Sequence, residues 1–281
     1  MNSATSPMHC VSTGPEHAPP LVFLHGFMGD SADWAEIAAA LTPDFRCIAF
    51  DLPGHGRSAE ICLGFEETRD AVVQQLAGIG VAHYGLVGYS MGGRLALGIA
   101  LTHGDRVHRA VLESASPGIA DPAQRAARRA GDEKLAARLE AIGNAAEFEA
   151  FLRDWYARPL WRSLEERPEL LEALIEQRTQ GNPGALARAL RALGTGTQAS
   201  LWDALPAATP ALLCLAGERD SKFRAIAEEM GARCPAMRVQ VIPACGHNAH
   251  LEAPGEYAAH LRAFFSETSE NEHREAASCP R

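Results

Sequence analysis

The 281-residue sequence lacks the marks of a membrane protein and of a nucleic-acid-binding protein. No apolar run reaches the roughly 18 residues of a spanning helix, and no positively charged N-terminal stretch is followed by an apolar one. Positive charge is also scarce: the formal net charge is -9, whereas nucleic-acid binders usually present a basic surface. We therefore expect no membrane and no nucleic acid among the partners, and the cytoplasm as the location.

Motifs for cofactors and metals are missing as well. The sequence has no glycine-rich dinucleotide fingerprint after a strand, no P-loop and no cluster of metal-ligand residues. Its seven cysteines are an odd number without a C-x-x-C pair, which predicts reduced thiols rather than disulfides or a zinc site. We therefore expect no cofactor and no metal, and Cys245 is the cysteine closest to a candidate site.

What is present is an alternation of short apolar runs with helical patterns. The apolar runs are LVFL, CIAF, GLVGY, AVLE, ALLCLA and VQVI, at 21–24, 47–50, 85–89, 110–113, 211–216 and 239–242. Helical patterns between several of these runs cover 34–41, 68–78, 91–103 and 224–232. Such alternation is typical of a mostly parallel sheet covered by helices on both faces. The predicted fold class is α/β.

One long segment interrupts the alternation. From 117 to 202 the sequence is rich in Ala, Arg, Glu and Leu at helical spacing, without a strand pattern. Breaks that predict about four helices occur at Gly131, Gly143, Pro159, Pro168 and 181–184. We expect a helical cap over the carboxyl ends of the sheet, where ligands bind in open α/β folds. The predicted division is core 1–116, cap 117–202, core 203–266 and a disordered tail 267–281.

The strongest local motif places a serine between small residues. Gly88-Tyr89-Ser90-Met91-Gly92 follows a strand pattern and opens a helical one, which is the context of the G-x-S-x-G nucleophile elbow. The turn is so tight that its flanking positions must be small, and it exposes the serine oxygen near the positive end of the helix dipole. Ser90 is therefore the candidate reactive serine.

A reactive serine needs an imidazole to take its proton and a carboxylate to orient that imidazole. His247 lies on a loop after the last strand pattern, and His250 is its nearby rival. Asp220 follows the run ALLCLA, and Glu218 is the alternative acid. The order Ser90, Asp220, His247 on three loops at strand ends is that of an α/β-hydrolase triad.

The oxyanion hole of this fold uses two backbone N–H groups. His25-Gly26-Phe27 ends the first strong strand pattern, and Met91 follows the serine. The N–H groups of Phe27 and Met91 are therefore the predicted donors.

Six segments together carry a resemblance to a known family. They are LVFLHGFMGDSADW, FDLPGHGRS, LVGYSMGGR, DWYARP, GERDSKF and GHNAHLE. Over about 21–254 the chain resembles the 2-succinyl-6-hydroxy-2,4-cyclohexadiene-1-carboxylate synthase family of menaquinone biosynthesis, a branch of the α/β-hydrolase superfamily. The resemblance implies a lyase that eliminates pyruvate from 2-succinyl-5-enolpyruvyl-6-hydroxy-3-cyclohexene-1-carboxylate. Ser90 would abstract a ring proton, and the oxyanion hole would stabilise charge on the succinyl carbonyl oxygen.

The implied small-molecule substrate carries several carboxylates, so an acidic protein needs cations gathered inside its pocket. Arg94 lies one helical turn after Ser90 on the same face. By resemblance, the substrate-binding residues are His25, Tyr89, Arg94, Arg128, Trp155, Tyr156, Arg178, Lys222 and Phe223. Arg125 and Arg129 lie close to Arg128, and the sequence leaves open which of the three faces the pocket.

Two other functions remain possible at this point. A serine hydrolase, either an esterase or a carbon–carbon bond hydrolase, would use the same triad, and the cation cluster is what separates it from the lyase. A binding module that kept the pocket and lost catalysis is the second, and the intact triad argues against it.

Overall fold

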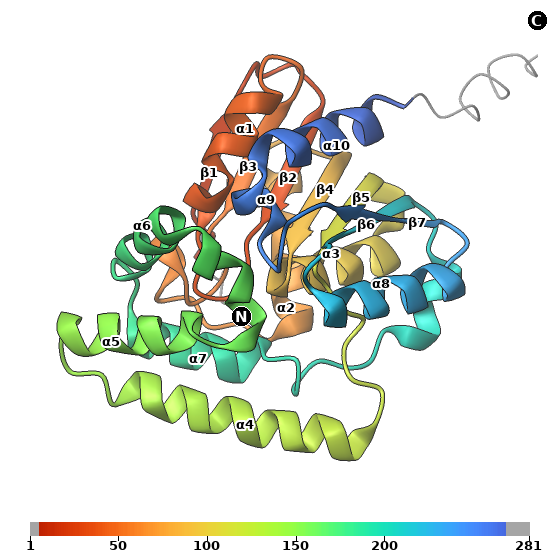
Figure 1. Cartoon of the computed structure of the whole chain (residues 1–281). Coiled ribbons are helices and arrows are strands. Elements are labelled where there is room, and N and C mark those ends of the chain that lie inside the picture. Colours follow the sequence, from red (N-terminus) through yellow and green to blue (C-terminus); the bar gives the residue numbers. More distant parts are fainter. Residues whose placement is uncertain (1–5, 268–281) are drawn as a thin grey trace, which may run out of the picture.

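The structure is a computed structural model that describes residues 6–267. Within that range a seven-stranded sheet has the order β1-β3-β2-β4-β5-β6-β7, with helices on both faces (Figure 1). Neighbouring strands pair in parallel, except that β1 is antiparallel to β3. The strands are β1 (Cys10–Thr13), β2 (Pro20–Leu24), β3 (Arg46–Phe50), β4 (Tyr84–Tyr89), β5 (Val107–Glu113), β6 (Ala211–Gly217) and β7 (Met237–Ile242). The predicted α/β class is confirmed.

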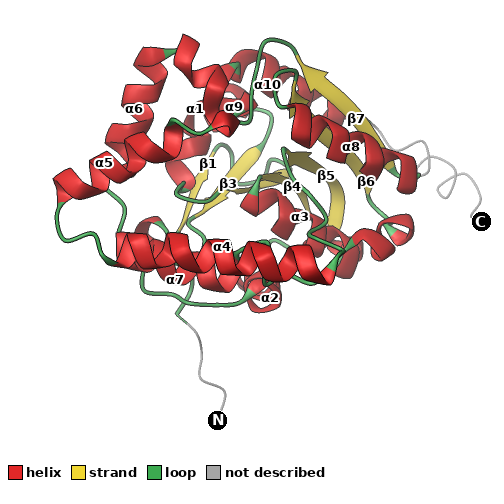
Figure 2. Ribbon diagram, turned by 60° about the horizontal axis from the view of Figure 1, so that its bottom comes forward, coloured by secondary structure: helices red, strands yellow, loops and turns green. Residues whose placement is uncertain are grey.

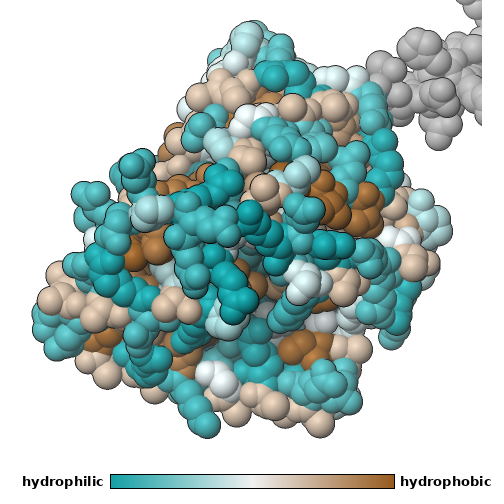
Figure 3. Space-filling view, viewed as in Figure 1, coloured by the Kyte–Doolittle hydropathy of each residue, from teal (hydrophilic) through white to brown (hydrophobic). Residues whose placement is uncertain are grey.

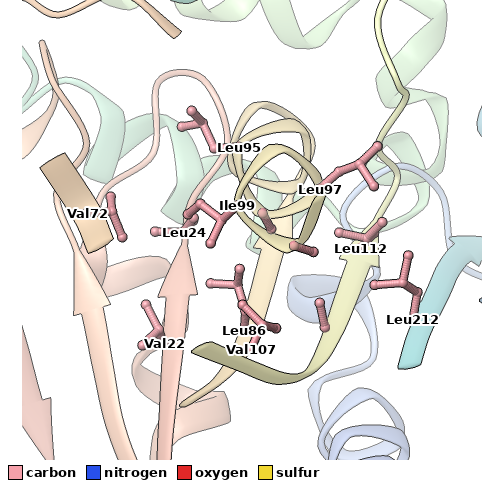
Figure 4. Packing of buried hydrophobic residues seen from close by; sticks show 14 of the residues in the cluster. Val22, Leu24, Val72, Leu86, Leu95, Leu97, Ile99, Val107, Leu112 and Leu212 are labelled. Atoms are coloured by element: carbon pink, nitrogen blue, oxygen red, sulfur yellow. The ribbon is translucent and has the colours of Figure 1, made fainter. Parts of the chain in front are cut away.

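The two faces of the sheet follow from the alternation of side chains along each strand. In β2, Val22 and Leu24 pack with α2, α3 and α8, whereas Leu21 and Phe23 pack with α1 and α10. Figure 4 shows the first of these faces, where Leu24 lies beside Ile99 of α3. The helices are α1 (Ala35–Leu41), α2 (Phe65–Gly78), α3 (Met91–Thr102), α8 (Ser221–Arg233), α9 (Ala249–Glu252) and α10 (Pro254–Ser266).

A layer of helices lies between β5 and β6 in the chain and covers one end of the sheet. It consists of α4 (Pro122–Glu140), α5 (Ala145–Tyr156), the 3-10 helix η4 (Pro159–Glu166), α6 (Pro168–Arg178) and α7 (Pro183–Leu193). The side chains of Asp121, Asn144 and Asn182 accept a backbone N–H at the starts of α4, α5 and α7. Figure 2 shows α4 and α7 side by side. These helices share an apolar cluster of their own, although the division of the chain into core and cap domains stays a prediction.

The predicted break at Gly131 is wrong, because α4 continues through it. A glycine inside a helix costs only about 1 kcal/mol relative to alanine. Packing of α4 along α7 offsets that cost, which no local pattern in the sequence reveals. The edge strand β1 was not predicted either, since most of its side chains are exposed and no apolar run marks it.

The face of the molecule seen in Figure 3 is largely polar. Figure 3 shows one face on which hydrophilic residues predominate and hydrophobic residues form small, scattered groups. Among residues 6–267, no helix combines the length and the apolar character needed to cross a bilayer. The predicted tail 267–281 lies, apart from Glu267, outside the described residues.

Candidate active site

Ser90 lies in a strained turn between β4 and α3. Its φ is +49°, a value that side-chain-bearing residues rarely adopt. A Cβ on Gly88 would lie 2.4 Å from the Gly92 carbonyl oxygen, and one on Gly92 would lie 2.1 Å from the Leu24 carbonyl oxygen. The Ser90 N–H donates to the Glu113 carbonyl oxygen over 2.8 Å. The two glycines therefore make the turn possible, and β5 holds it in place.

Ser90, His247 and Asp220 form a connected chain of hydrogen bonds. His247 Nε2 lies 3.2 Å from Ser90 Oγ, and His247 Nδ1 lies 2.6 Å from Asp220 Oδ2. Asp220 follows β6 and also accepts the Phe223 N–H at the start of α8. Asp220 accepts a hydrogen bond from the Nδ1–H of His247. Because the ring proton is then on Nδ1, Nε2 is unprotonated and accepts a hydrogen bond from the Ser90 O–H. The arrangement is that of a serine whose proton can pass to an imidazole.

The two rival residues point elsewhere. His250 Nδ1 lies 2.9 Å from Glu113 Oε1, and its ring stacks on Trp34. Glu218 accepts the Ala244 N–H over 2.9 Å. Both therefore have structural partners outside the Ser90–His247 pair.

The Phe27 and Met91 N–H groups are available beside Ser90. Neither has a hydrogen-bond acceptor among residues 6–267, and both residues line the same cavity as Ser90. The loop that carries Phe27 is fixed from below by His25, whose Nε2 accepts the Leu52 N–H over 2.9 Å. Burial lowers the pKa of His25, so this imidazole stays neutral. His25 is not among the described residues that line the cavity, and its observed partners support the loop that carries Phe27.

A cavity of about 150 Å³ is lined by Ser90 and His247 on one side and by residues of α4, α5, η4 and α7 on the other. The predicted site residues that line it are Phe27, Tyr89, Ser90, Met91, Arg94, Arg128, Trp155, Lys222, Phe223 and His247. Lining residues that sequence reasoning did not single out are Ser116, Asp132, Leu135, Leu160, Trp161, Leu190, Leu193, Gly194 and Thr195. The cavity is therefore mostly apolar, with its charge concentrated in a few side chains.

Arg94 is a buried cation held by uncharged partners. It donates to Gln198 Oε1 over 2.5 Å and to the Leu193 carbonyl oxygen over 2.6 Å. Burial, with a smaller effect of the nearby Arg128, lowers the pKa of Arg94 to about 10, so it stays protonated at neutral pH. Its positive charge faces the cavity without a carboxylate directly against it.

The structure separates the three candidate arginines of α4. Arg128 lines the cavity and donates from Nε to Asp132 Oδ1 over 2.7 Å. Arg129 donates to the Gly196 carbonyl oxygen, and Arg125 is not among the described lining residues. Arg128 is thus the arginine of α4 that faces the cavity.

Arg178 and Tyr156, to which the resemblance gives a substrate-binding role, are not among the described residues that line this cavity. The Arg178 guanidinium forms two hydrogen bonds to Asp33, at 2.7 and 2.8 Å, and both side chains are buried. Tyr156 packs against Arg178 and is buried too. The pair ties α6 of the cap to the loop after β2. Nothing in the sequence marks Asp33 as a buried partner, so this ion pair could not be foreseen.

The structure also bears on metal binding and on the reactivity of Cys245. Among residues 6–267 no group of His, Cys, Asp and Glu side chains could hold a metal ion. Cys245 is buried, which raises the pKa of its thiol to about 11. That thiol is therefore protonated at neutral pH and is a poor nucleophile.

Comparisons with known proteins agree on one family. Residues 21–260 match the model of the Alpha/beta hydrolase family. A 2-succinyl-6-hydroxy-2,4-cyclohexadiene-1-carboxylate synthase from Escherichia coli O17:K52:H18 is 39% identical over 244 residues, covering 86% of this chain and 92% of that protein. The chain belongs to this synthase family. The resemblance drawn from the six sequence segments is thereby confirmed.

Solved structures extend the comparison with this synthase family. The structure of MenH from S. aureus superposes with a TM-score of 0.85 at 33% identity, covering 92% of this chain and 97% of that one. An enol-lactonase from Burkholderia xenovorans LB400 superposes with a TM-score of 0.77 at 23% identity, covering 92% and 96%. At that identity the second likeness shows the fold alone.

Proposed function

We propose that this chain eliminates pyruvate from 2-succinyl-5-enolpyruvyl-6-hydroxy-3-cyclohexene-1-carboxylate, giving 2-succinyl-6-hydroxy-2,4-cyclohexadiene-1-carboxylate in menaquinone or phylloquinone biosynthesis. The observation that carries the proposal is the joint occurrence of a hydrogen-bonded triad and three cations, Arg94, Arg128 and Lys222, around one cavity of a synthase-family member. The Escherichia coli relatives are named for the synthesis of 2-succinyl-6-hydroxy-2,4-cyclohexadiene-1-carboxylate, and the place in quinone biosynthesis rests on the family resemblance. The cytoplasmic location and the absence of a cofactor remain predictions.

The triad supplies the base. Ser90 Oγ removes the ring proton at the carbon that carries the succinyl group, while its own proton passes to His247 Nε2. The electron pair of the broken C–H bond is first held as a dienolate, with its charge on the succinyl carbonyl oxygen. When the dienolate collapses, a new ring double bond forms, the existing double bond shifts, and the bond to the enolpyruvyl oxygen breaks. Asp220 stabilises the imidazolium that forms. The proton held by His247 Nε2 then passes to the departing enolpyruvate, which tautomerises to pyruvate.

The oxyanion hole lowers the barrier to this proton transfer. Loss of the ring proton places negative charge on the succinyl carbonyl oxygen. The Phe27 and Met91 N–H groups, which lack other acceptors among the described residues, are the donors for that oxygen. Removing one such donor typically costs about 10²–10³ in kcat.

The cations bind the carboxylates of the substrate. Arg94 is the best placed, because it is buried, protonated and held by neutral partners. Lys222 lines the cavity beside Phe223, and Arg128 reaches it from the cap. A neutral ester would gain nothing from this charge, whereas a polycarboxylate gains charge-assisted hydrogen bonds.

The test is release of pyruvate from the enolpyruvyl cyclohexene substrate, followed with a coupled lactate dehydrogenase assay. Wild-type protein is expected to turn over, Ser90→Ala to lose activity, and Arg94→Gln to lose kcat/KM. Arg138→Gln is the matched control, since Arg138 is exposed and pairs with Asp154 at the surface. Equal kcat/KM in Arg94→Gln and Arg138→Gln would show that Arg94 does not bind a carboxylate of the substrate.

A serine hydrolase remains the second candidate, because the same triad and oxyanion donors suit ester cleavage. A p-nitrophenyl ester assay run in parallel separates the two. Ser90-dependent ester turnover without pyruvate release would replace the lyase with an esterase.

A further inference from the structure

Glu252 is a buried carboxylate beside the His247 loop that the mechanism leaves unused. It ends α9 and is 4% exposed. The Gly246 N–H donates to both of its oxygens, at 3.1 and 3.0 Å, and the Asn248 N–H donates to Oε1 over 3.4 Å. These are the two backbone N–H groups on either side of His247. The Glu252 side chain thus binds the loop that carries His247, here called the catalytic loop, on both sides of the histidine.

The same carboxylate is held from the other side by the cap. Ser163 of η4 donates its hydroxyl to Glu252 Oε1 over 3.0 Å. Arg167, just after η4, donates to the Glu252 carbonyl oxygen, and its Nε lies 4.0 Å from Oε2. A buried carboxylate is unfavourable unless it is well hydrogen-bonded, and here the donors come from the catalytic loop and the cap together.

Direct packing supports the same link. A Cβ on Gly246 would lie 2.0 Å from Ser163 Oγ, so the serine sits against the backbone of the catalytic loop. The ring of Trp161, also in η4, meets the His247 ring edge-on with centroids 5.2 Å apart. Segment η4 therefore contacts His247, Gly246 before it, and the Glu252 carboxylate that binds the loop on both sides of His247.

We propose that Glu252 is a positioning residue for His247, and that Ser163 holds Glu252 in place, so that η4 of the cap maintains the geometry of the triad. His247 must keep two hydrogen bonds at once, 2.6 Å to Asp220 and 3.2 Å to Ser90. Small displacements of a reacting group lower the rate steeply. Glu252 is not among the described residues that line the substrate cavity, so its loss acts on catalysis rather than on binding.

The test compares Glu252→Gln, Ser163→Ala and the control Ser58→Ala. Ser58 is also a buried serine with a hydrogen bond, accepting the His9 N–H over 2.9 Å, but it lies in the loop after β3. Glutamine replaces one acceptor oxygen by a donor that opposes the Gly246 N–H. We expect kcat for pyruvate release to fall about 10–100-fold in Glu252→Gln with KM little changed. Ser163→Ala should lose about fivefold, the value of one hydrogen bond, and Ser58→Ala should match wild type.

A second readout does not depend on the substrate. The Nδ1 proton shared by His247 and Asp220 should give a strongly downfield proton NMR signal, identified by its loss in His247→Gln. We expect Glu252→Gln and Ser163→Ala to shift or broaden this signal while circular dichroism shows folded protein, and Ser58→Ala to leave it unchanged.

The kcat reading rests on the proposed function, whereas the NMR signal rests on the triad alone. Wild-type protein that shows the signal but releases no pyruvate would reject the proposed function; a perturbed signal in Glu252→Gln would still support this inference. An unchanged signal and unchanged kcat in both Glu252→Gln and Ser163→Ala would overturn it. Activity lost only in proportion to unfolded protein, with a normal signal from the folded fraction, would overturn it as well.

Discussion

Two buried arginines of this protein stand in opposite surroundings. Arg94 has an amide oxygen and a backbone carbonyl as hydrogen-bond partners, so no carboxylate is bonded to its guanidinium beside the cavity. Arg178 is matched by both oxygens of Asp33 and lies away from the cavity. Burial lowers the pKa of Arg94, whereas Asp33 outweighs the effect of burial and raises that of Arg178. Arg94, with neutral hydrogen-bond partners at the cavity, can bind an anionic substrate, whereas the Arg178–Asp33 pair, away from the cavity, stabilises the fold.

The largest expected effect comes from breaking the neutralised pair. Arg178→Gln leaves Asp33 buried without its cation, and losing one partner of such a pair typically costs about 3–5 kcal/mol. Urea denaturation should show that loss in the free energy of unfolding. The double variant Asp33→Asn with Arg178→Gln should recover part of it, and a double variant as unstable as Arg178→Gln would contradict the pairing.

The second effect is on substrate rather than on stability. Arg94→Gln should lower kcat/KM for pyruvate release by about 10–100-fold, since a hydrogen bond to a charged group contributes about 1.5–3 kcal/mol. Its free energy of unfolding should fall less than that of Arg178→Gln, because Arg94→Gln leaves neutral acceptors, and no buried carboxylate, without a partner. Steady-state kinetics measure the change in kcat/KM, and urea denaturation of the same samples measures the change in the free energy of unfolding. A large loss of stability in Arg94→Gln would erase the contrast with Arg178.

Acid should weaken the Asp33–Arg178 pair selectively. Burial alone would raise the pKa of Asp33, but Arg178 brings it below the ordinary value. A carboxyl with a depressed pKa in the folded state stabilises the protein above its unfolded pKa, about 3.9, and that stability is lost as pH falls further. The free energy of unfolding of the Asp33→Asn, Arg178→Gln variant should therefore fall less than that of wild type below about pH 4. The measurement is the free energy of unfolding from urea denaturation at several pH values below about 5. An equal fall with pH in wild type and the double variant would contradict this prediction.

The smallest effect comes from the neutral support of Arg94. Gln198→Ala removes one acceptor of the guanidinium and should lower kcat/KM about fivefold, the value of a single hydrogen bond. Gln198→Glu tests whether the neutral partner matters. A carboxylate at this position would neutralise Arg94, so it should reduce kcat/KM more than alanine does. Kinetics with the two variants decide the order.

The sequence predicted the elements that local rules govern. Strand patterns such as 85–89 and the elbow at Ser90 follow from side-chain alternation and from the need for glycine in a tight turn, and the structure has both. The family resemblance indicated six of the residues that line the cavity, namely Tyr89, Arg94, Arg128, Trp155, Lys222 and Phe223.

What the sequence could not predict depends on distant partners. Arg94 and Arg178 are both helix arginines in the sequence, and only the fold shows that Asp33 lies against one of them. Asp132 of the cavity wall and Glu252 behind the histidine were missed for the same reason. A buried carboxylate carries no local pattern that distinguishes it from a solvated one.

The most direct test of the lyase proposal is the time course of pyruvate together with the absorbance of the conjugated diene product, for wild type and Ser90→Ala. With wild type the two products should appear together in equal amounts, and Ser90→Ala should produce them no faster than buffer. Ester hydrolysis without pyruvate, or equal pyruvate release by Ser90→Ala and wild type, would contradict it.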